Sequence, residues 1–259
     1  MGLVTSNDSA AALDLLRRAA DAVVAALADH GDWGPSGQRD GQYASDLVAD
    51  AAALGVLGEA GVRVLSEESG LGGGSSSGLT VVVDPLDGST NASHGIPWFA
   101  TSLCAVDADG PLAAVVHHLV LGHRYEAVRD GGATRDGVDI SPTGATRLDD
   151  AIVGLSGYPP HYLGWRQFRA LGAVALDLCA VADGTLDGYL DCSWNAHGSW
   201  DYLGGLLVCR EAGAHVVDAF DRDLVALAHD DRRTPLAGAT PELLQQIADA
   251  RRTFATPAG

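Results

Sequence analysis

The stretch Leu79-Thr80-Val81-Val82-Val83-Asp84-Pro85-Leu86-Asp87-Gly88-Ser89-Thr90-Asn91 decides the fold of this chain. Its first five residues are apolar or β-branched, which predicts a buried β-strand. The strand runs directly into Asp84 and Asp87, and two carboxylates at the end of a buried strand are costly unless a cation neutralises them. A hard cation such as Mg²⁺ takes oxygen ligands, including backbone carbonyls such as that of Leu86. The stretch therefore predicts a divalent-metal site at the end of this strand.

An ordinary turn is the competing interpretation of the same residues, because Asp, Pro and Gly all favour turns. The strand before the turn and the residues Gly88, Ser89 and Thr90 after it favour a site. Backbone N–H groups at the start of a helix can hold an anion there. A carboxylate that bridges two cations about 3.5–4 Å apart would suit in-line displacement at phosphorus.

Other acidic residues stand at the ends of other predicted elements. Glu67 and Glu68 follow a short predicted strand, and neighbours on an extended backbone point to opposite faces, so one of the two is expected to reach the site. Asp201 and Asp46 each open a predicted helix. An acid at a helix N-terminus stabilises the helix by itself, so each of these positions also has a purely structural explanation when it is taken alone.

The periodicity of apolar residues predicts two halves with no long linker between them. Residues 1–145 form an α+β half with most of the metal ligands and an antiparallel meander over 100–140, and residues 146–259 form an α/β half that carries Asp201. The Gly- and Ser-rich residues 70–78 are predicted to form a flexible surface loop. Helices are predicted over 9–31 with Ser9 as cap, 45–57, 168–182, 200–212 and from Thr240 onward, and further strands over 62–65, 151–155, 186–191 and 215–218.

Composition narrows the class of partner. The 259 residues carry a net charge of −18, and all 16 basic residues are arginine. Such a chain is a poor non-specific binder of nucleic acid, and it repels an anionic metabolite unless a bound cation reverses the local charge. No apolar run is long enough to span a membrane, and acidic residues interrupt the first thirty residues, which argues against a secretory signal. Four cysteines without metal-binding or redox spacing predict free thiols and a cytoplasmic protein.

Three strings together resemble the inositol monophosphatase family. They are Ser66-Glu67-Glu68-Ser69, Val82 to Asn91, and Trp200-Asp201-Tyr202-Leu203-Gly204-Gly205 followed by Glu211-Ala212-Gly213. They occur in the family's order, and the similarity covers nearly the whole chain. The resemblance implies a layered αβαβα sandwich, a Mg²⁺-dependent and typically lithium-sensitive phosphatase activity with two to three ions per site, and a homodimer.

The resemblance also implies roles for individual residues. Glu67, Asp84 and the Leu86 carbonyl would hold a first ion, with Asp84 as the bridge, and Asp87 and Asp201 a second. Ser89 stands where the family usually has Thr and would orient the attacking water with Asp46, or with Asp50, while Gly88, Ser89 and Thr90 bind the phosphoryl oxygens. Asp191 matches an acid that contacts substrate hydroxyls. Compared with the family, three extra residues then precede Trp200, and Trp194 lies among them. We expect Trp194 to pack the loop, with stacking on a substrate as the alternative. His197 aligns with no family position.

The implied function is hydrolysis of a small phosphate ester such as inositol monophosphate by direct attack of a metal-activated water. Histidinol phosphate, sugar phosphates, fructose 1,6-bisphosphate and 3′-phosphoadenosine compounds are alternative substrates within the same superfamily. A non-catalytic, metal-binding regulatory protein is the alternative from another class. Retention of every proposed metal ligand and of the Ser89 hydroxyl speaks against it.

Overall fold

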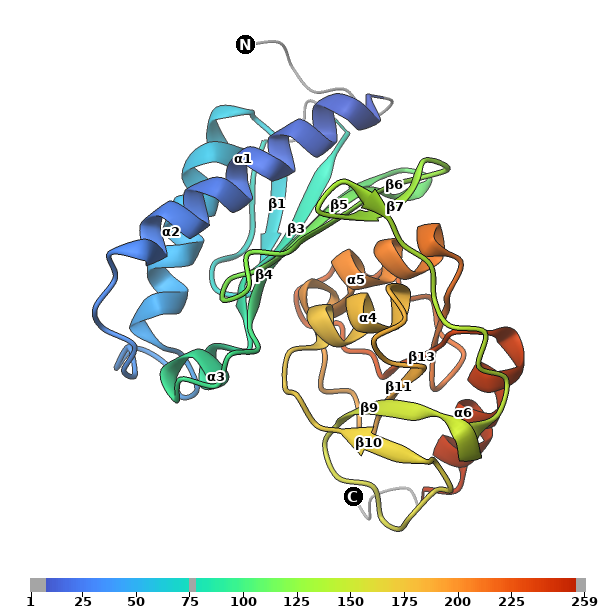
Figure 1. Cartoon of the computed structure of the whole chain (residues 1–259). Helices are drawn as coiled ribbons and strands as arrows, with labels where there is room; N and C mark the ends of the chain where they lie inside the picture. The colour runs from blue at the N-terminus through green and yellow to red at the C-terminus, as the bar shows by residue number, and fades with distance from the viewer. Residues whose placement is uncertain (1–7, 75–77, 255–259) are drawn as a thin grey trace.

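A computed structural model describes residues 8–74 and 78–254, in which two β-sheets alternate with layers of helix (Figure 1). None of the helices in these two ranges is both long enough and apolar enough to cross a bilayer. The helices are α1 (Ser9–Ala28), α2 (Ala44–Glu59), α3 (Ser89–Ser93), α4 (Val174–Ala182), α5 (Ser199–Ala212) and α6 (Pro241–Arg252), with one 3-10 turn at Leu148–Asp150.

The larger sheet has eight strands in the order β2-β1-β3-β4-β5-β6-β7-β8. Only the β1–β3 pair is parallel, and the run from β3 to β8 is antiparallel, which confirms the predicted meander. Its strands are β1 (Arg63–Ser66), β2 (Gly70–Gly73), β3 (Thr80–Asp87), β4 (Ala100–Asp107), β5 (Gly110–His118), β6 (Arg124–Val128), β7 (Gly132–Arg135) and β8 (Val138–Asp139).

The smaller sheet has five strands in the order β10-β9-β11-β13-β12. Because β10, β9 and β11 are mutually parallel, their carboxyl ends meet at one edge of the sheet. Its strands are β9 (Ile152–Ser156), β10 (Gln167–Arg169), β11 (Gly188–Asp191), β12 (His215–Asp218) and β13 (Pro235–Gly238). The larger sheet is built from residues before 145 and the smaller sheet from residues after it. A division of the chain into two domains at this point stays a prediction.

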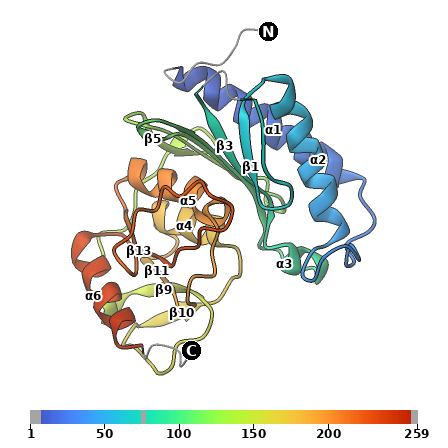
Figure 2. The same ribbon diagram turned by 180° about the vertical axis from the view of Figure 1, so that it is seen from behind.

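Five layers result from this arrangement. Helices α1 and α2 cover one face of the larger sheet, α4 and α5 lie between the two sheets, and α6 covers the outer face of the smaller sheet (Figures 1 and 2). Each helix is held by an apolar face: α1 buries Leu15, Leu16, Val23 and their alanine neighbours. The structure therefore confirms the predicted αβαβα sandwich.

The helix predicted over 168–182 is wrong in its first third. Phe168 lies in β10 and is 52% exposed, and the helix begins only at Val174. The reason is Gly172, whose φ of +87° breaks any helix that reaches it, while Ala173 is extended. Strands β10 and β13 are absent from the prediction, because strands of three and four residues carry little periodic signal.

Two other local predictions need correction. Gly70–Gly73 is not a loop but the strand β2, which pairs antiparallel with β1; residues 75–77 of the predicted loop lie outside the described ranges. Helix α1 is capped by Asp8 rather than Ser9, through its Oδ1 atom, which accepts a 2.9 Å hydrogen bond from the Ala11 N–H. The cap predicted at Thr240 is confirmed, because its side chain accepts from the Leu243 N–H at 3.2 Å.

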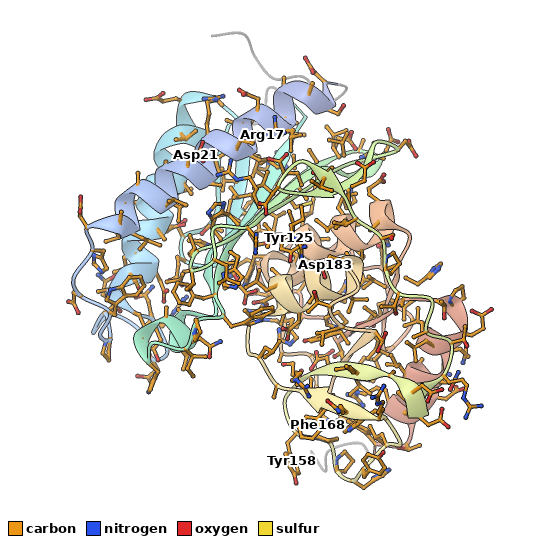
Figure 3. All side chains as sticks on the ribbon, in the orientation of Figure 1. Arg17, Asp21, Tyr125, Tyr158, Phe168 and Asp183 are labelled. Carbon is orange, nitrogen blue, oxygen red and sulfur yellow. The ribbon has the colours of Figure 1, made fainter. Side chains whose placement is uncertain are left out.

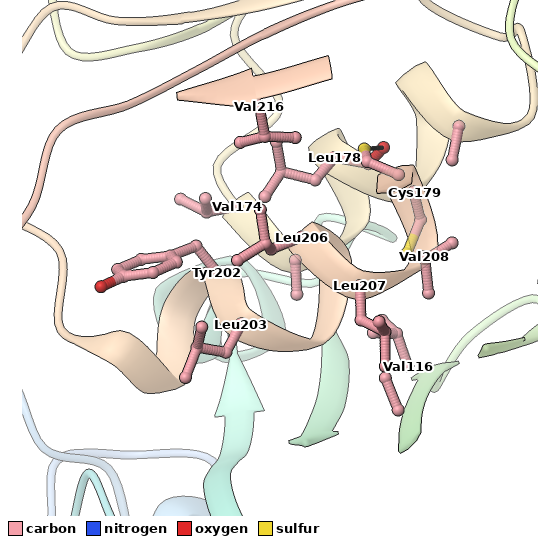
Figure 4. Packing of buried hydrophobic residues seen from close by; sticks show 14 of the residues in the cluster. Val116, Val174, Leu178, Cys179, Tyr202, Leu203, Leu206, Leu207, Val208 and Val216 are labelled. Atoms are coloured by element: carbon pink, nitrogen blue, oxygen red, sulfur yellow. Dashed lines mark hydrogen bonds between the residues drawn. The ribbon is translucent and has the colours of Figure 1, made fainter. Parts of the chain in front are cut away.

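Helix α5 lies closest to its neighbours at Gly204 and Gly205. A Cβ atom on Gly204 would lie 2.5 Å from Ser102 Oγ in β4, and one on Gly205 would lie 2.7 Å from Leu178 Cβ in α4. The remaining side chains of α4 and α5 fill the space between the sheets, reaching Val116 in β5 on one side and Val216 in β12 on the other (Figure 4). The glycine pair therefore sets how closely α5 approaches both α4 and the larger sheet.

We expect Gly205→Ala to lower the free energy of unfolding by about 1–3 kcal/mol, because the added methyl group overpacks a rigid contact with α4. Urea unfolding with an unchanged denaturant slope measures this loss. Gly55→Ala in α2 is the matched control. A Cβ there meets nothing within 4 Å, so the exchange should be neutral or stabilise by up to about 1 kcal/mol. Equal effects of the two exchanges would contradict the packing argument.

Asp177 is a fully buried carboxyl group in α4, and Trp98 Nε1 donates a 2.9 Å hydrogen bond to it. Burial raises its pKa to about 7. The folded protein thus keeps this proton up to near neutral pH, whereas the unfolded chain releases it near pH 3.8. Between these two values the folded state binds more protons, so its stability falls as the pH rises.

Asp177→Asn should therefore stabilise the protein at pH 8, by about 1–4 kcal/mol, and leave it nearly unchanged at pH 4. Asparagine keeps an acceptor for Trp98 and removes the buried charge. Unfolding by urea in EDTA across this pH range measures the difference, with the exposed Asp109→Asn as control. Parallel pH profiles for wild type and Asp177→Asn would refute the assignment.

Candidate metal and phosphate site

Three carboxylates meet where β3 ends against the start of α5. One oxygen from each of Asp84, Asp87 and Asp201 lies within 4.8 Å of the other two. In a regular strand, residues three apart point to opposite faces. The pairing of β3 with β4 shifts register between Asp84 and Asp87, and this irregularity lets both side chains turn to the same side. Asp201 joins them from the first turn of α5.

Glu67 brings a fourth carboxylate to the group. Its N–H donates to the Val83 carbonyl at 3.1 Å, so the chain after β1 stays beside β3 up to this residue. Glu68 has different partners: its carboxylate accepts from Arg39 at 2.9 Å and from Gln42. The two neighbouring side chains thus diverge, as the sequence predicted, although they do so from the turn that follows β1 and not from extended backbone.

These carboxylates repel one another in a buried place. Burial, followed by the charges of the neighbouring acids, raises the pKa values of Glu67 and Asp84 well above the usual range. Burial and the charge of Asp201 raise the pKa of Asp87 in the same way. Among the described residues, none of these three acids forms an ion pair with an arginine. A buried set of carboxylate oxygens without arginine partners fits a hard divalent ion.

Backbone groups orient two of the proposed metal ligands. The Leu86 N–H donates to Asp84 Oδ1 at 3.0 Å, within the turn that also carries the Leu86 carbonyl. The Ala175 N–H donates to Asp87 Oδ2 at 2.7 Å from the first turn of α4. Each hydrogen bond fixes one oxygen of its carboxylate and leaves the other oxygen available to a metal ion. Carboxylates held in this way are suited to be metal ligands.

Gly88 connects these acids to the predicted phosphate turn. It has a φ of +84° and is the residue before α3, whose first residues are Ser89 and Thr90. A Cβ atom at Gly88 would lie 3.0 Å from the Trp98 carbonyl, so the turn has no room for a side chain. Asn91 fixes the turn to the rest of the protein, because its amide donates to the carbonyls of Trp98 and Leu171, both at 2.7 Å.

Asp46, rather than Asp50, lies next to Ser89. Burial raises the pKa of Asp46 to about 6, and a hydrogen bond with Ser89 is among the weaker interactions that act against this rise. Its Oδ2 atom also accepts from the Tyr43 N–H at 2.8 Å. Asp50 instead accepts a 2.6 Å hydrogen bond from Ser66 Oγ. The geometry therefore favours Asp46 of the two predicted partners.

His197 is the residue of this region to which the sequence assigned no role. Its Nε2 atom lies 3.3 Å from Asp191 Oδ2, and its Nδ1 atom lies 3.6 Å from Asp201 Oδ2. Burial lowers its pKa, but the hydrogen bonds with these two carboxylates outweigh burial and raise it to about 10. The spacing of four residues between His197 and Asp201 is the only signal that the sequence offers, and the inserted residues obscure it.

Arg251 of α6 holds the inserted loop from behind. Its guanidinium donates to the carbonyls of Asp191 at 2.9 Å and Ser193 at 2.7 Å. It also lies 4.5 Å from the ring centre of Trp194, which stacks on Phe220 at 5.4 Å. Trp194 thus packs against the protein, as its sequence context favoured. We call Arg251 with these two rings the α6 clamp; it fixes the backbone on both sides of Cys192.

Known proteins are similar to this chain in sequence and in fold. The profile of the inositol monophosphatase family matches residues 10–254. A fructose-1,6-bisphosphatase from Pyrococcus furiosus is 33% identical over 205 residues, which cover 78% of this chain and 80% of that protein. An inositol-1-monophosphatase from Mesorhizobium japonicum is 34% identical over 197 residues, covering 69% and 73%.

A solved structure gives the same result for the fold. A Pyrococcus horikoshii protein described as similar to inositol-1 monophosphatase superimposes with a TM-score of 0.79 at 27% identity, covering 93% of this chain and 96% of that one. The sequence profile and the solved structure match nearly the whole length, and the two relatives match more than two thirds of it. This chain belongs to the inositol monophosphatase family.

Proposed function

We propose that this protein is a Mg²⁺-dependent phosphomonoesterase that hydrolyses a small phosphate ester by direct attack of water. The observation that carries the proposal is the convergence of Asp84, Asp87 and Asp201 within 4.8 Å beside the turn at Gly88. A cluster of oxygen ligands next to backbone N–H groups suits a phosphate bound between metal and main chain. The family's phosphatases and the names of the relatives support the same reaction.

The proposed metal ligands are Glu67, Asp84, the Leu86 carbonyl, Asp87 and Asp201. Two to three Mg²⁺ ions held there would supply the positive charge that activates water and neutralises the phosphoryl group. The chain's own groups position the reactants. N–H groups of Gly88, Ser89 and Thr90 bind the phosphoryl oxygens in our proposal.

The proton of the attacking water leaves through side chains next to the phosphate turn. Ser89 orients the water through its hydroxyl, and Asp46, the acid beside that hydroxyl, holds it in place in our proposal. Glu67, whose carboxylate lies close enough to Asp201, Asp46 and Asp87 to interact with their charges, helps to accept the proton in our proposal. Water attacks phosphorus while the bond to the alcohol oxygen breaks, and that oxygen regains a proton from solvent, so the step needs no covalent enzyme intermediate.

Asp191 is our proposed contact for the hydroxyl groups of the substrate. It ends β11 beside the site, its side chain is fully buried, and its Oδ1 atom accepts from the Ser193 N–H at 2.8 Å. His197, placed between Asp191 and Asp201, is a second candidate for this contact. Inositol monophosphate is the proposed substrate. Several archaeal relatives bear names that combine fructose-1,6-bisphosphatase with inositol-1-monophosphatase, which makes fructose 1,6-bisphosphate the first alternative.

Inhibition by lithium and a homodimer are proposed by family analogy alone. A cytoplasmic location is proposed from the free cysteines, and a small phosphorylated metabolite as partner, with neither nucleic acid nor membrane, from the net charge and the lack of a long apolar run. Histidinol phosphate and 3′-phosphoadenosine compounds are further alternative substrates. A non-catalytic, metal-binding regulator is the alternative from another class.

Phosphate release from inositol, histidinol, sugar and nucleotide phosphates tests the proposal directly. We expect release with Mg²⁺, none in EDTA, and a loss of at least about 100-fold in Asp87→Asn, because one ligand and one charge of the cluster disappear. Asp109→Asn on the exposed β4–β5 turn is the control for a lost charge. Failure of the folded, Mg²⁺-loaded protein to hydrolyse any ester would refute the phosphatase and favour the regulator.

The α6 clamp gives a second prediction. Arg251→Met removes both hydrogen bonds to the loop that carries Asp191, so we expect KM for inositol 1-phosphate to rise about 5–20-fold with kcat changed less than about threefold. Arg251→Lys should restore part of the loss. Arg252→Met, which breaks an exposed ion pair with Asp249, is the neighbouring control. A fall in kcat with KM unchanged would show that the clamp does not act through substrate binding.

A further inference from the structure

An aromatic pocket lies at the β9–β10 connection, outside the acidic site. Tyr158, Tyr162, Trp165 and Phe168 surround a space of about 260 Å³, together with Leu155, Gly157, Pro159, His161 and Ala170. Trp165 is buried, but Tyr158 is 90% exposed, Tyr162 69% and Phe168 52%. Large apolar side chains gathered on a surface mark a binding site more often than isolated ones do.

The pocket is held in shape by contacts among its own rings. Trp165 lies edge-on to Tyr162 at 5.7 Å and tilted to Phe168 at 5.8 Å. The Tyr162 hydroxyl donates to the Trp165 carbonyl, which closes the loop on itself. Phe168 projects from β10, and Tyr158 lines the same pocket from the β9–β10 loop (Figure 3). The rings therefore form a defined surface with Trp165 as its floor.

The chain connects this pocket to the acidic site on two sides. Gly157, in the wall, follows Ser156, whose Oγ atom lies 3.3 Å from His197 Nε2. Ala170, in the opposite wall, precedes Leu171, whose carbonyl accepts from Asn91 in the phosphate turn at 2.7 Å. Both walls are thus one residue away from groups that touch the site. Because β9, β10 and β11 are parallel, the pocket shares the carboxyl edge of the sheet with Asp191.

Charge also favours this side of the site for a phosphate ester. The protein carries 34 acidic residues, yet none stands between Ala151 and Leu176, whereas Arg166, Arg169 and His161 do. The rest of the chain repels an anion, and this segment does not. An anionic substrate is therefore best accommodated with its bulk over β9 and β10.

We propose that the aromatic pocket is a subsite for the leaving group of the ester, which carries a planar aromatic ring joined to the phosphate through a hydroxylated spacer. The inference rests on the proposed phosphatase function. With phosphate at the turn of Ser89 and Thr90, the spacer passes Asp191 and the ring stacks on Tyr158 and Phe168. Nucleoside monophosphates have this chemistry, and stacking of a base on one aromatic side chain is worth about 1–3 kcal/mol.

The test compares kcat/KM for adenosine 3′-monophosphate with kcat/KM for inositol 1-phosphate in wild type, Tyr158→Ala and Phe168→Ala. We expect each exchange to lower the ratio of the two values about 5–100-fold. Leu121→Ala, which removes a 60% exposed apolar side chain in the β5–β6 connection, should leave the ratio unchanged. An unaltered ratio in both aromatic variants, with inositol 1-phosphate still hydrolysed, overturns the subsite and leaves the phosphatase function intact.

Binding of the nucleoside alone provides a readout that needs no turnover. Titration of adenosine into the full chain should quench tryptophan fluorescence to saturation, and Phe168→Ala should weaken this binding by a similar factor. Absence of saturable quenching overturns the ring-binding role whether or not any ester is hydrolysed. A second copy of the chain could instead fill the pocket, and sedimentation of both variants tests this alternative. If a dimer dissociates on Phe168→Ala while the ratio of the two kcat/KM values stays unchanged, the pocket belongs to an interface and the proposal is overturned.

Discussion

Repulsion among buried carboxylates at the end of β3 is the constraint on which the other features of the site depend. Asp84 and Asp87 are nearly inaccessible to solvent, and their oxygens lie within 4.8 Å of those of Asp201. Burial alone would drive such groups to take up protons. Three contacts of the group oppose that tendency: the N–H groups of Leu86 and Ala175 donate hydrogen bonds to it, and the imidazole of His197 lies 3.6 Å from Asp201. The remaining negative charge is what a divalent cation would neutralise.

The layers of the sandwich bring these charges together from distant parts of the chain. The irregular β3–β4 pairing turns Asp84 and Asp87 to one side. Helix α5 brings Asp201 from the middle layer, and the close contacts at Gly204 and Gly205 set the distance of that helix from β4 and α4. Helix α4 in turn donates its Ala175 N–H to Asp87. A shift of the middle layer would therefore change metal affinity before it exposed much of the core.

Local sequence predicted the parts of the site that depend on local rules. A β-branched run that ends in Asp84 and Asp87 predicts both the strand and its acidic end, and the alternation of Glu67 and Glu68 predicts that the two diverge. Local rules do not decide between Asp46 and Asp50, one helical turn apart, because that choice depends on where α2 lies against α3 and β1. The sequence assigned His197 no role because its two partners, Asp191 and Asp201, come together only through folding. The helix predicted through Phe168 failed because a single positive φ at Gly172 outweighs its apolar periodicity.

Two separable surfaces result from this geometry. The groups proposed to handle phosphate come from β3, α3 and the first turn of α5, whereas the groups proposed to contact the leaving alcohol come from the carboxyl edge of β9, β10 and β11. Binding energy from the second surface adds to catalysis only if the substrate is held rigidly between the two. The contacts that supply such rigidity are Arg251 on the Asp191 backbone and Asn91 on the Leu171 carbonyl. Substrate preference can therefore change at the β9–β10 loop without any change of metal ligand, whereas loosening either contact would weaken the coupling between the two surfaces.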